Sequence, residues 1–161
     1  ILDLRGNPGG YLEAAVDMAS WFLPPGKVVV REEFARGDEE KVHRSRGYNI
    51  FTDRLKMVIL VDGGSASASE ILAGALSEHG IATLVGTKTF GKGSVQELVP
   101  MTDDTALKVT VARWLTPNGV SISEQGLIPQ VEIKLDKKEE KKETGKEKDV
   151  QLEKAIEILN D

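Results

Sequence analysis

Apolar residues follow two different periods along this chain, and the two periods alternate. The run Met57-Val58-Ile59-Leu60-Val61 is continuous and of strand length, which is typical of a strand buried on both faces. Residues 66–79 instead carry apolar side chains at helical spacing, and Gly80 stands where a C-terminal cap belongs. Strand and helix patterns that follow one another in this way favour an α/β fold.

The same patterns predict further elements along the chain. A helix is expected from Leu12 to Phe22, and Pro24-Pro25 stops it. The remaining expected strands are short and rich in β-branched residues, and they cover 28–31, 81–85, 95–99, 106–112 and 131–135. The strand at 95–99 is expected to end at Pro100. Residues 34–54 are polar and irregular, which predicts a surface loop or hairpin that would leave His43 in solvent.

The first residues predict a piece of a longer protein. The chain opens in a strand that runs into the glycine-rich turn 5–10, with neither a Met start nor the layout of a signal peptide. Domains seldom begin in mid-strand. We expect a core at 1–135, a charged linker at 136–149 and a C-terminal helix at 150–161, since twelve of the fourteen linker residues are charged.

Composition excludes several functions. A length of 161 residues suits one domain, and a net charge of −5 gives no footprint for nucleic acid. No apolar run reaches the roughly 18 residues that an integral membrane segment requires. Cysteine is absent and there are two histidines, so thiolate chemistry is ruled out and a His-rich metal cluster is disfavoured.

The densest chemical signal is the run Ser65-Ala66-Ser67-Ala68-Ser69-Glu70 at the junction of a strand and a helix. A hydroxyl at a helix N-terminus faces free N–H groups and the positive end of the helix dipole, which suits a nucleophile and the oxyanion that it creates. The spacing Ser67 to Glu70 equally fits a capping box, in which the serine only caps the helix. The local sequence leaves both interpretations open.

A base for such a serine is found in the loop after the next strand. Lys92 lies between Gly91 and Gly93 beside the apolar Phe90, and removal of water there would let a lysine act as a neutral base. An ordinary exposed lysine is the simpler alternative. The segment 86–92 also imitates a phosphate-binding loop, but Gly93 replaces the Ser or Thr that should follow and no helix begins there.

Four stretches, in order, resemble the carboxyl-terminal processing peptidases, also called tail-specific proteases. The family motifs match 2–10, 64–71, 85–96 and 109–119. This resemblance implies a crotonase-like or ClpP-like spiral of strand-strand-helix units, truncated here at its N-terminus. Asp62 and Gln130 depart from the family pattern, which has Asn and Asp at these positions.

The resemblance also implies a catalytic apparatus. Ser67 corresponds to the nucleophile, Lys92 to its general base, and Gln96 to the residue that orients the lysine. The oxyanion hole corresponds to the N–H of Ala68 together with that of one of two glycines, Gly9 or Gly10.

The implied function is a serine endopeptidase that cuts proteins near their C-termini through an acyl-enzyme, with no metal or cofactor. Its implied partners are proteins or peptides with accessible apolar C-terminal tails. The parent protein would be extracytoplasmic, in a periplasm, cell envelope or thylakoid lumen. A PDZ domain and an N-terminal region, absent from this chain, would bind the tail, so the fragment need not be active alone. The oligomeric state stays open.

Three alternatives compete with this hypothesis. A crotonase-like acyl-CoA enzyme would share the fold without needing the set of Ser67, Lys92 and Gln96. A non-catalytic scaffold would use Ser67 only as a helix cap. A nucleotide-binding protein would use the loop 86–92 for phosphate.

Overall fold

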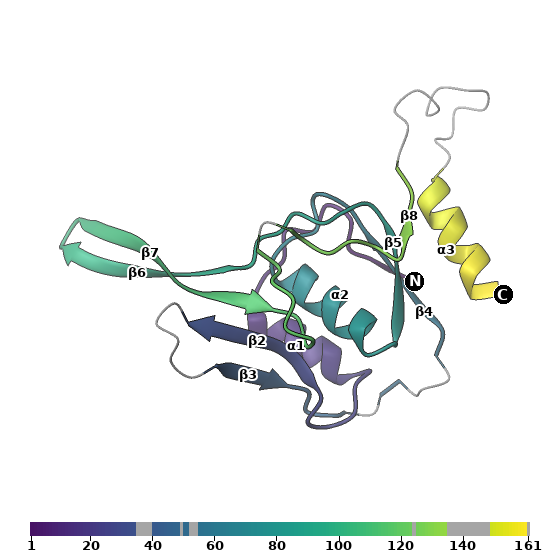
Figure 1. Ribbon diagram of the computed structural model, residues 1–161, viewed down its shortest axis with the longest axis horizontal. Helices are drawn as coiled ribbons and strands as arrows, with labels where there is room; N and C mark the ends of the chain where they lie inside the picture. The colour runs from purple at the N-terminus through teal and green to yellow at the C-terminus, as the bar shows by residue number, and fades with distance from the viewer. Residues whose placement is uncertain (35–39, 49, 52–54, 124, 135–148, 161) are drawn as a thin grey trace.

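A parallel sheet lies with helices on either side of it (Figure 1). The computed structural model describes residues 1–34, 40–48, 50–51, 55–123, 125–134 and 149–160. The sheet has the strand order β1-β4-β5-β8, and its members are β1 (Leu2–Asp3), β4 (Met57–Val61), β5 (Ala82–Gly86) and β8 (Val131–Glu132). All three pairings are parallel, and Ile59 of β4 lies between Leu2 of β1 and Leu84 of β5.

A second, antiparallel sheet has the strand order β3-β2-β7-β6. Its members are β2 (Val28–Phe34), β3 (Lys41–Arg44), β6 (Ser94–Thr102) and β7 (Thr105–Leu115). The α/β class is confirmed by this arrangement of one parallel and one antiparallel sheet with helices.

Helices cover both faces of the parallel sheet. One apolar cluster joins α1 (Leu12–Ser20) and α2 (Ala68–Glu78) to β2 and to one face of β4 and β5. On the opposite face, Val58 and Leu60 pack against Ala155 of α3 (Val150–Asn160). Successive strand residues point to opposite faces, so the continuous apolar run of β4 reflects burial on both sides.

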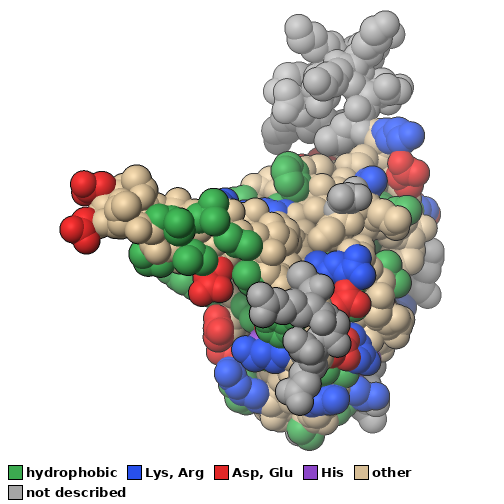
Figure 2. Space-filling model, turned by 60° about the vertical axis from the view of Figure 1, so that its left-hand side comes forward, with side chains coloured by type: hydrophobic (Ala, Val, Ile, Leu, Met, Phe, Trp, Pro, Cys, Tyr) green, Lys and Arg blue, Asp and Glu red, His purple; other side chains and the backbone are tan. Residues whose placement is uncertain are grey.

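The strands β6 and β7 continue beyond the body as a two-stranded arm (Figure 1). Pro100 does not end β6, because it pairs with Ala106 on an edge strand, where a missing N–H need not break the ladder. The expected end of the strand at Pro100 is therefore wrong. The arm exposes several large apolar side chains, visible as a green stripe in Figure 2, and these include Leu98, Met101 and Leu107.

The polar segment 34–54 contains the strand β3, and its His43 is partly buried beside Trp114, with its ring nitrogen 3.4 Å from Glu32 Oε2. The prediction of a solvated His43 is therefore wrong.

Nearly all of the expected linker 136–149 falls outside the described residues. Within the described part, no helix is both long and apolar enough to cross a bilayer.

Candidate active site

The turn between β4 and α2 holds Ser67 in an unusual backbone conformation. Ser67 has φ 56° and ψ −120°, and no other non-glycine residue in the described part has a positive φ. A side chain in this conformation costs roughly 1–3 kcal/mol, so the surrounding structure must enforce it. Ser67 and Glu70 are arranged as a capping box, in which Glu70 Oε2 accepts a hydrogen bond from Ser67 N at 2.9 Å.

The glycine-rich loop after β1 packs directly against this turn. Ala66 N donates to Asn7 O at 3.0 Å, and the Ser65 hydroxyl donates to Leu4 O at 2.7 Å. Asp62 Oδ1 accepts from Gly6 N at 2.8 Å and from Ser65 N at 3.1 Å, so one carboxylate orders both loops. The Asp that departs from the family pattern therefore has a local structural role.

Gly9 leaves a space in front of the first N–H of α2. A Cβ on Gly9 would lie 2.7 Å from Ala68 N and 2.9 Å from Ser67 Cβ, and its φ of +90° also disfavours a side chain. Ala68 is the first residue of α2, so its N–H has no acceptor within the helix. Gly9 N donates to Asn7 Oδ1 at 2.9 Å, whereas Gly10 N has no hydrogen bond within the described residues.

The buried carboxylate of Glu70 connects the serine turn to the lysine loop. Glu70 has no exposed surface, and its Oε2 accepts from Ser67 N and from Lys92 N, both at 2.9 Å. Its Oε1 accepts from Thr89 Oγ1 at 2.5 Å and from Gly91 N at 2.8 Å. The backbone of the predicted nucleophile and that of the predicted base thus share one oxygen atom.

The side chains of Lys92 and Gln96 are less closely engaged than their backbones. Both are exposed, and neither forms a hydrogen bond with Ser67 in the described part of the chain. Phe90 is 64% exposed and does not shield the lysine. Of the two interpretations of Lys92, the exposed loop lysine is therefore the one observed in the described residues, although its backbone N–H shares an acceptor with that of Ser67.

An ion-pair cluster joins the start of this site to α3. The guanidinium of Arg5 donates to Asp3 and to Asp149, each at 2.7 Å, and to Gln151 Oε1 at 3.1 Å. These hydrogen bonds from Arg5 lower the pKa of Asp3 and of Asp149 below the ordinary carboxyl value. Arg5 directly precedes the glycine loop, so the docking of α3 helps to hold that loop.

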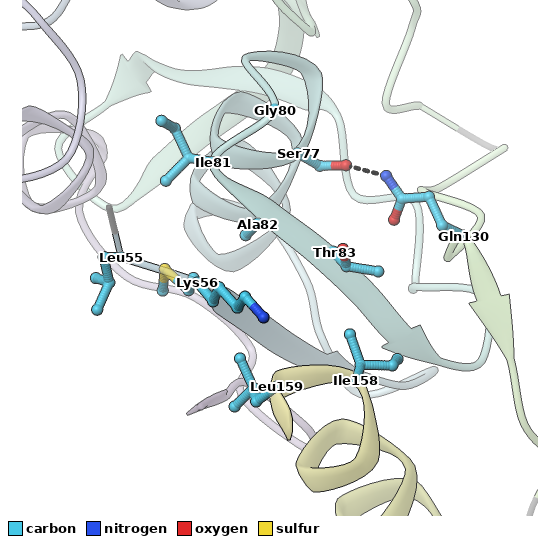
Figure 3. A pocket seen from close by; sticks show the side chains of 11 residues that line it. Leu55, Lys56, Ser77, Gly80, Ile81, Ala82, Thr83, Gln130, Ile158 and Leu159 are labelled. Atoms are coloured by element: carbon cyan, nitrogen blue, oxygen red, sulfur yellow. Dashed lines mark hydrogen bonds between the residues drawn. The ribbon is translucent and has the colours of Figure 1, made fainter. Parts of the chain in front are cut away.

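An open pocket of about 520 Å³ lies at the amino ends of the parallel strands β4 and β5 (Figure 3). Lys56 and Thr83 line it, and Gln130 closes one side by donating to the Ser77 hydroxyl. Ser67 follows the carboxyl end of β4, so this pocket is separate from the candidate site. Among the described residues, no group of three or more Asp, Glu or His side chains could hold a metal ion.

Sequence reasoning missed the larger role of Glu70. Its position three residues after Ser67 indicated only a capping partner. Glu70 is an acidic residue among small and apolar residues at the start of a helix. Such a residue indicates a buried carboxylate that needs several hydrogen-bond donors. The donors come from a loop that begins after the next strand, and a capping pattern cannot reveal such a contact.

Comparisons with known proteins identify the family to which this chain belongs. The model of peptidase family S41 matches residues 1–133. The carboxy-terminal-processing protease of Bartonella bacilliformis is 42% identical over 133 residues, which are 83% of this chain and 30% of that protein. The carboxyl-terminal-processing peptidase 3 of Arabidopsis thaliana, named as chloroplastic, is 44% identical over 132 residues, 82% of this chain and 25% of that protein.

A solved structure of a processing protease is also similar to this chain. The photosystem II D1 C-terminal processing protease superposes with a TM-score of 0.75 at 38% identity, covering 82% of this chain and 33% of that one. The chain spans less than a third of the length of the two curated relatives. The matched region includes both loops of the candidate site, and the chain belongs to peptidase family S41.

Proposed function

We propose that the protein containing this chain is a serine endopeptidase that processes other proteins near their C-termini, with Ser67 as nucleophile and Lys92 as general base. The observation that carries the proposal is the shared contact of Ser67 N and Lys92 N with one oxygen of Glu70. The strained φ of Ser67 is a second support, because such strain is concentrated at functional sites.

In the proposed reaction, the neutral amine of Lys92 removes the proton of the Ser67 hydroxyl as Ser67 Oγ attacks the peptide carbonyl. The oxygen of the tetrahedral intermediate is stabilised by the N–H of Ala68 and, we propose, that of Gly10. Gly10 is preferred to Gly9 because Gly9 N is already bonded to Asn7. Lys92 then protonates the leaving amine, and water releases the acyl group.

The exposure of Lys92 sets a condition on this reaction. Removal of the water around a lysine favours its neutral amine, the form that can act as a base. We propose that bound substrate, or a part of the protein outside these residues, covers the loop 87–93 and brings the amine to Ser67. Gln96, near the start of β6, would then orient the amine.

The substrates and the location of the protein are proposed from its resemblance to the carboxyl-terminal processing peptidases. Substrates would be proteins with accessible apolar C-terminal tails, held in part by a PDZ domain elsewhere in the protein. The chloroplastic relative and the family resemblance support an extracytoplasmic or organelle-lumen location.

The test is cleavage of an unfolded protein with an apolar tail by the full-length protein, followed on a gel. We expect Ser67→Ala and Lys92→Ala to abolish cleavage while the circular dichroism spectrum is unchanged. Lys88→Ala is the matched control, because Lys88 is an exposed lysine of the same loop. Cleavage by Ser67→Ala at the wild-type rate would leave the helix-cap interpretation in place.

A further inference from the structure

Arg5 links the glycine-rich loop after β1 to the start of α3. A guanidinium has five N–H donors, and each of those of Arg5 forms one hydrogen bond. Two go to Asp3, two go to the carboxylate of Asp149 at 2.9 and 2.7 Å, and one goes to Gln151 Oε1 at 3.1 Å. Three of the five donors of Arg5 therefore bind residues at the start of α3, far along the chain from the loop.

The start of α3 is organised around this link. Asp149 Oδ1 also accepts from Leu152 N at 3.0 Å, as the side chain of an N-cap residue does. Gln151 has no exposed surface, and its Nε2 donates to Ile133 O at 2.8 Å, so its amide is held between Arg5 and the end of β8. A helix of 11 residues is marginal in water on its own, so α3 and its contact with Arg5 form together.

The glycine loop needs such a link because its own backbone is permissive. Gly6 and Gly9 both have a positive φ, at 64° and 90°. The turn before α2 holds the loop through hydrogen bonds at Gly6 N and Asn7 O. Gly10 N, the proposed donor to the oxyanion, lies five residues after Arg5 and has no hydrogen bond within the described residues. Its position therefore depends also on where Arg5 holds the start of the loop.

We propose that Asp149 is a positioning residue for the oxyanion hole: through Arg5 it holds the glycine loop so that the N–H of Gly10 faces the developing oxyanion. The inference rests on the proposed peptidase function. It assigns a role to α3, which lies outside the residues 1–133 that the family model matches. An oxyanion donor acts on charge that develops in the transition state, so its displacement lowers kcat more than it alters KM.

The experiment compares the full-length wild type with Asp149→Asn on a quenched fluorescent peptide. Asparagine caps a helix as well as aspartate does, so α3 keeps its cap while Arg5 loses a bidentate carboxylate. We expect kcat to fall by about 10- to 100-fold with KM within about 2-fold, since a displacement of about 1 Å costs about 100-fold. Glu157→Gln is the matched control on the same helix, because it removes a carboxylate that pairs with Lys154 at the surface, and it should leave kcat unchanged.

A second background tests whether Asp149 acts through Arg5. Arg5→Met should lower kcat by a similar factor, and Asp149→Asn should have no further effect on kcat in the Arg5→Met protein. A helix that contributed only to general stability would give the same loss in both backgrounds. Amide hydrogen exchange gives a readout that does not depend on activity. The amide of Ala66 should exchange faster in Asp149→Asn, because its acceptor is the carbonyl of Asn7 in the displaced loop.

Three results would overturn the positioning role and leave the peptidase function standing. They are a wild-type kcat in Asp149→Asn, an equal loss of kcat in the Arg5→Met background, and an unchanged exchange rate of the Ala66 amide. If the wild type cuts the peptide no faster than Ser67→Ala does, the proposed function fails, and the catalytic role of Asp149 fails with it.

Discussion

Replacement of the Glu70 carboxylate by an amide tests the connection between the two loops. In Glu70→Gln one carboxylate oxygen becomes an NH₂ group, while four donors still point at the site. If the NH₂ faces Thr89 and Gly91, the Thr89 hydroxyl can adapt but Gly91 N loses its acceptor. If it faces the other way, the N–H groups of Ser67 and Lys92 are both left unpaired.

The loss of stability expected for Glu70→Gln follows from these hydrogen bonds. A hydrogen bond to a charged group contributes about 1.5–3 kcal/mol, and a buried N–H without an acceptor costs about 1–3 kcal/mol. Glu70→Gln should therefore lower the free energy of unfolding by about 2–4 kcal/mol. A displacement of the base of about 1 Å is expected to lower kcat/KM by about 100-fold.

The assay combines urea unfolding of the full-length protein with amide hydrogen exchange. In Glu70→Gln we expect faster exchange of the amides of Gly91 and Lys92, because their acceptor is changed. Glu78→Gln is the matched control on the same helix, since Glu78 accepts one N–H at the surface, and it should alter stability by less than about 0.5 kcal/mol. Equal stability and equal exchange in the two variants would refute the role assigned to Glu70.

Two further predictions concern the glycine loop and the Arg5 cluster. Gly9→Ala should abolish peptide cleavage, since its Cβ would collide with the serine turn. Gly10→Ala should remain active, because no heavy atom lies within 4 Å of its Cβ position. The cleavage rates of the two variants are compared, and an active Gly9→Ala would contradict the proposed oxyanion hole. The lowered pKa values of Asp3 and Asp149 mean that the unfolded chain binds protons more readily than the folded chain, so their stabilising effect is complete above the ordinary carboxyl pKa and is lost as pH falls through the lowered values. Urea midpoints at pH 7 and pH 3 should therefore differ less in Arg5→Met than in the wild type, and an unchanged difference would count against the cluster.

The hydrophobic patterns of single segments predicted β4 and α2, the elements on either side of the serine turn. The continuous apolar run predicted β4 with its observed bounds, since a strand buried on both faces has no polar alternation. The helix expected at 66–79 is observed as α2, which begins after Ser67.

Contacts between distant segments were not predictable in this way. The arm formed by β6 and β7 extends through Pro100, because pairing with β7 outweighs the local preference of proline. The contact between Arg5 and Asp149 joins nearly opposite ends of the chain, and no periodic pattern encodes it. The exposure of Lys92 agrees with the simpler of its two interpretations, an ordinary exposed lysine, because lysine side chains are seldom buried.

The most direct test of the central claim is detection of the acyl-enzyme. The full-length protein would be mixed with an activated ester of an aliphatic amino acid, quenched in acid and mapped by mass spectrometry. We predict an added mass on Ser67 equal to the acyl group less the hydrogen that it replaces, no adduct in Ser67→Ala or Lys92→Ala, and a normal adduct in Lys88→Ala. An adduct on another residue, or cleavage of substrate by a Ser67→Ala protein, would contradict Ser67 as the nucleophile.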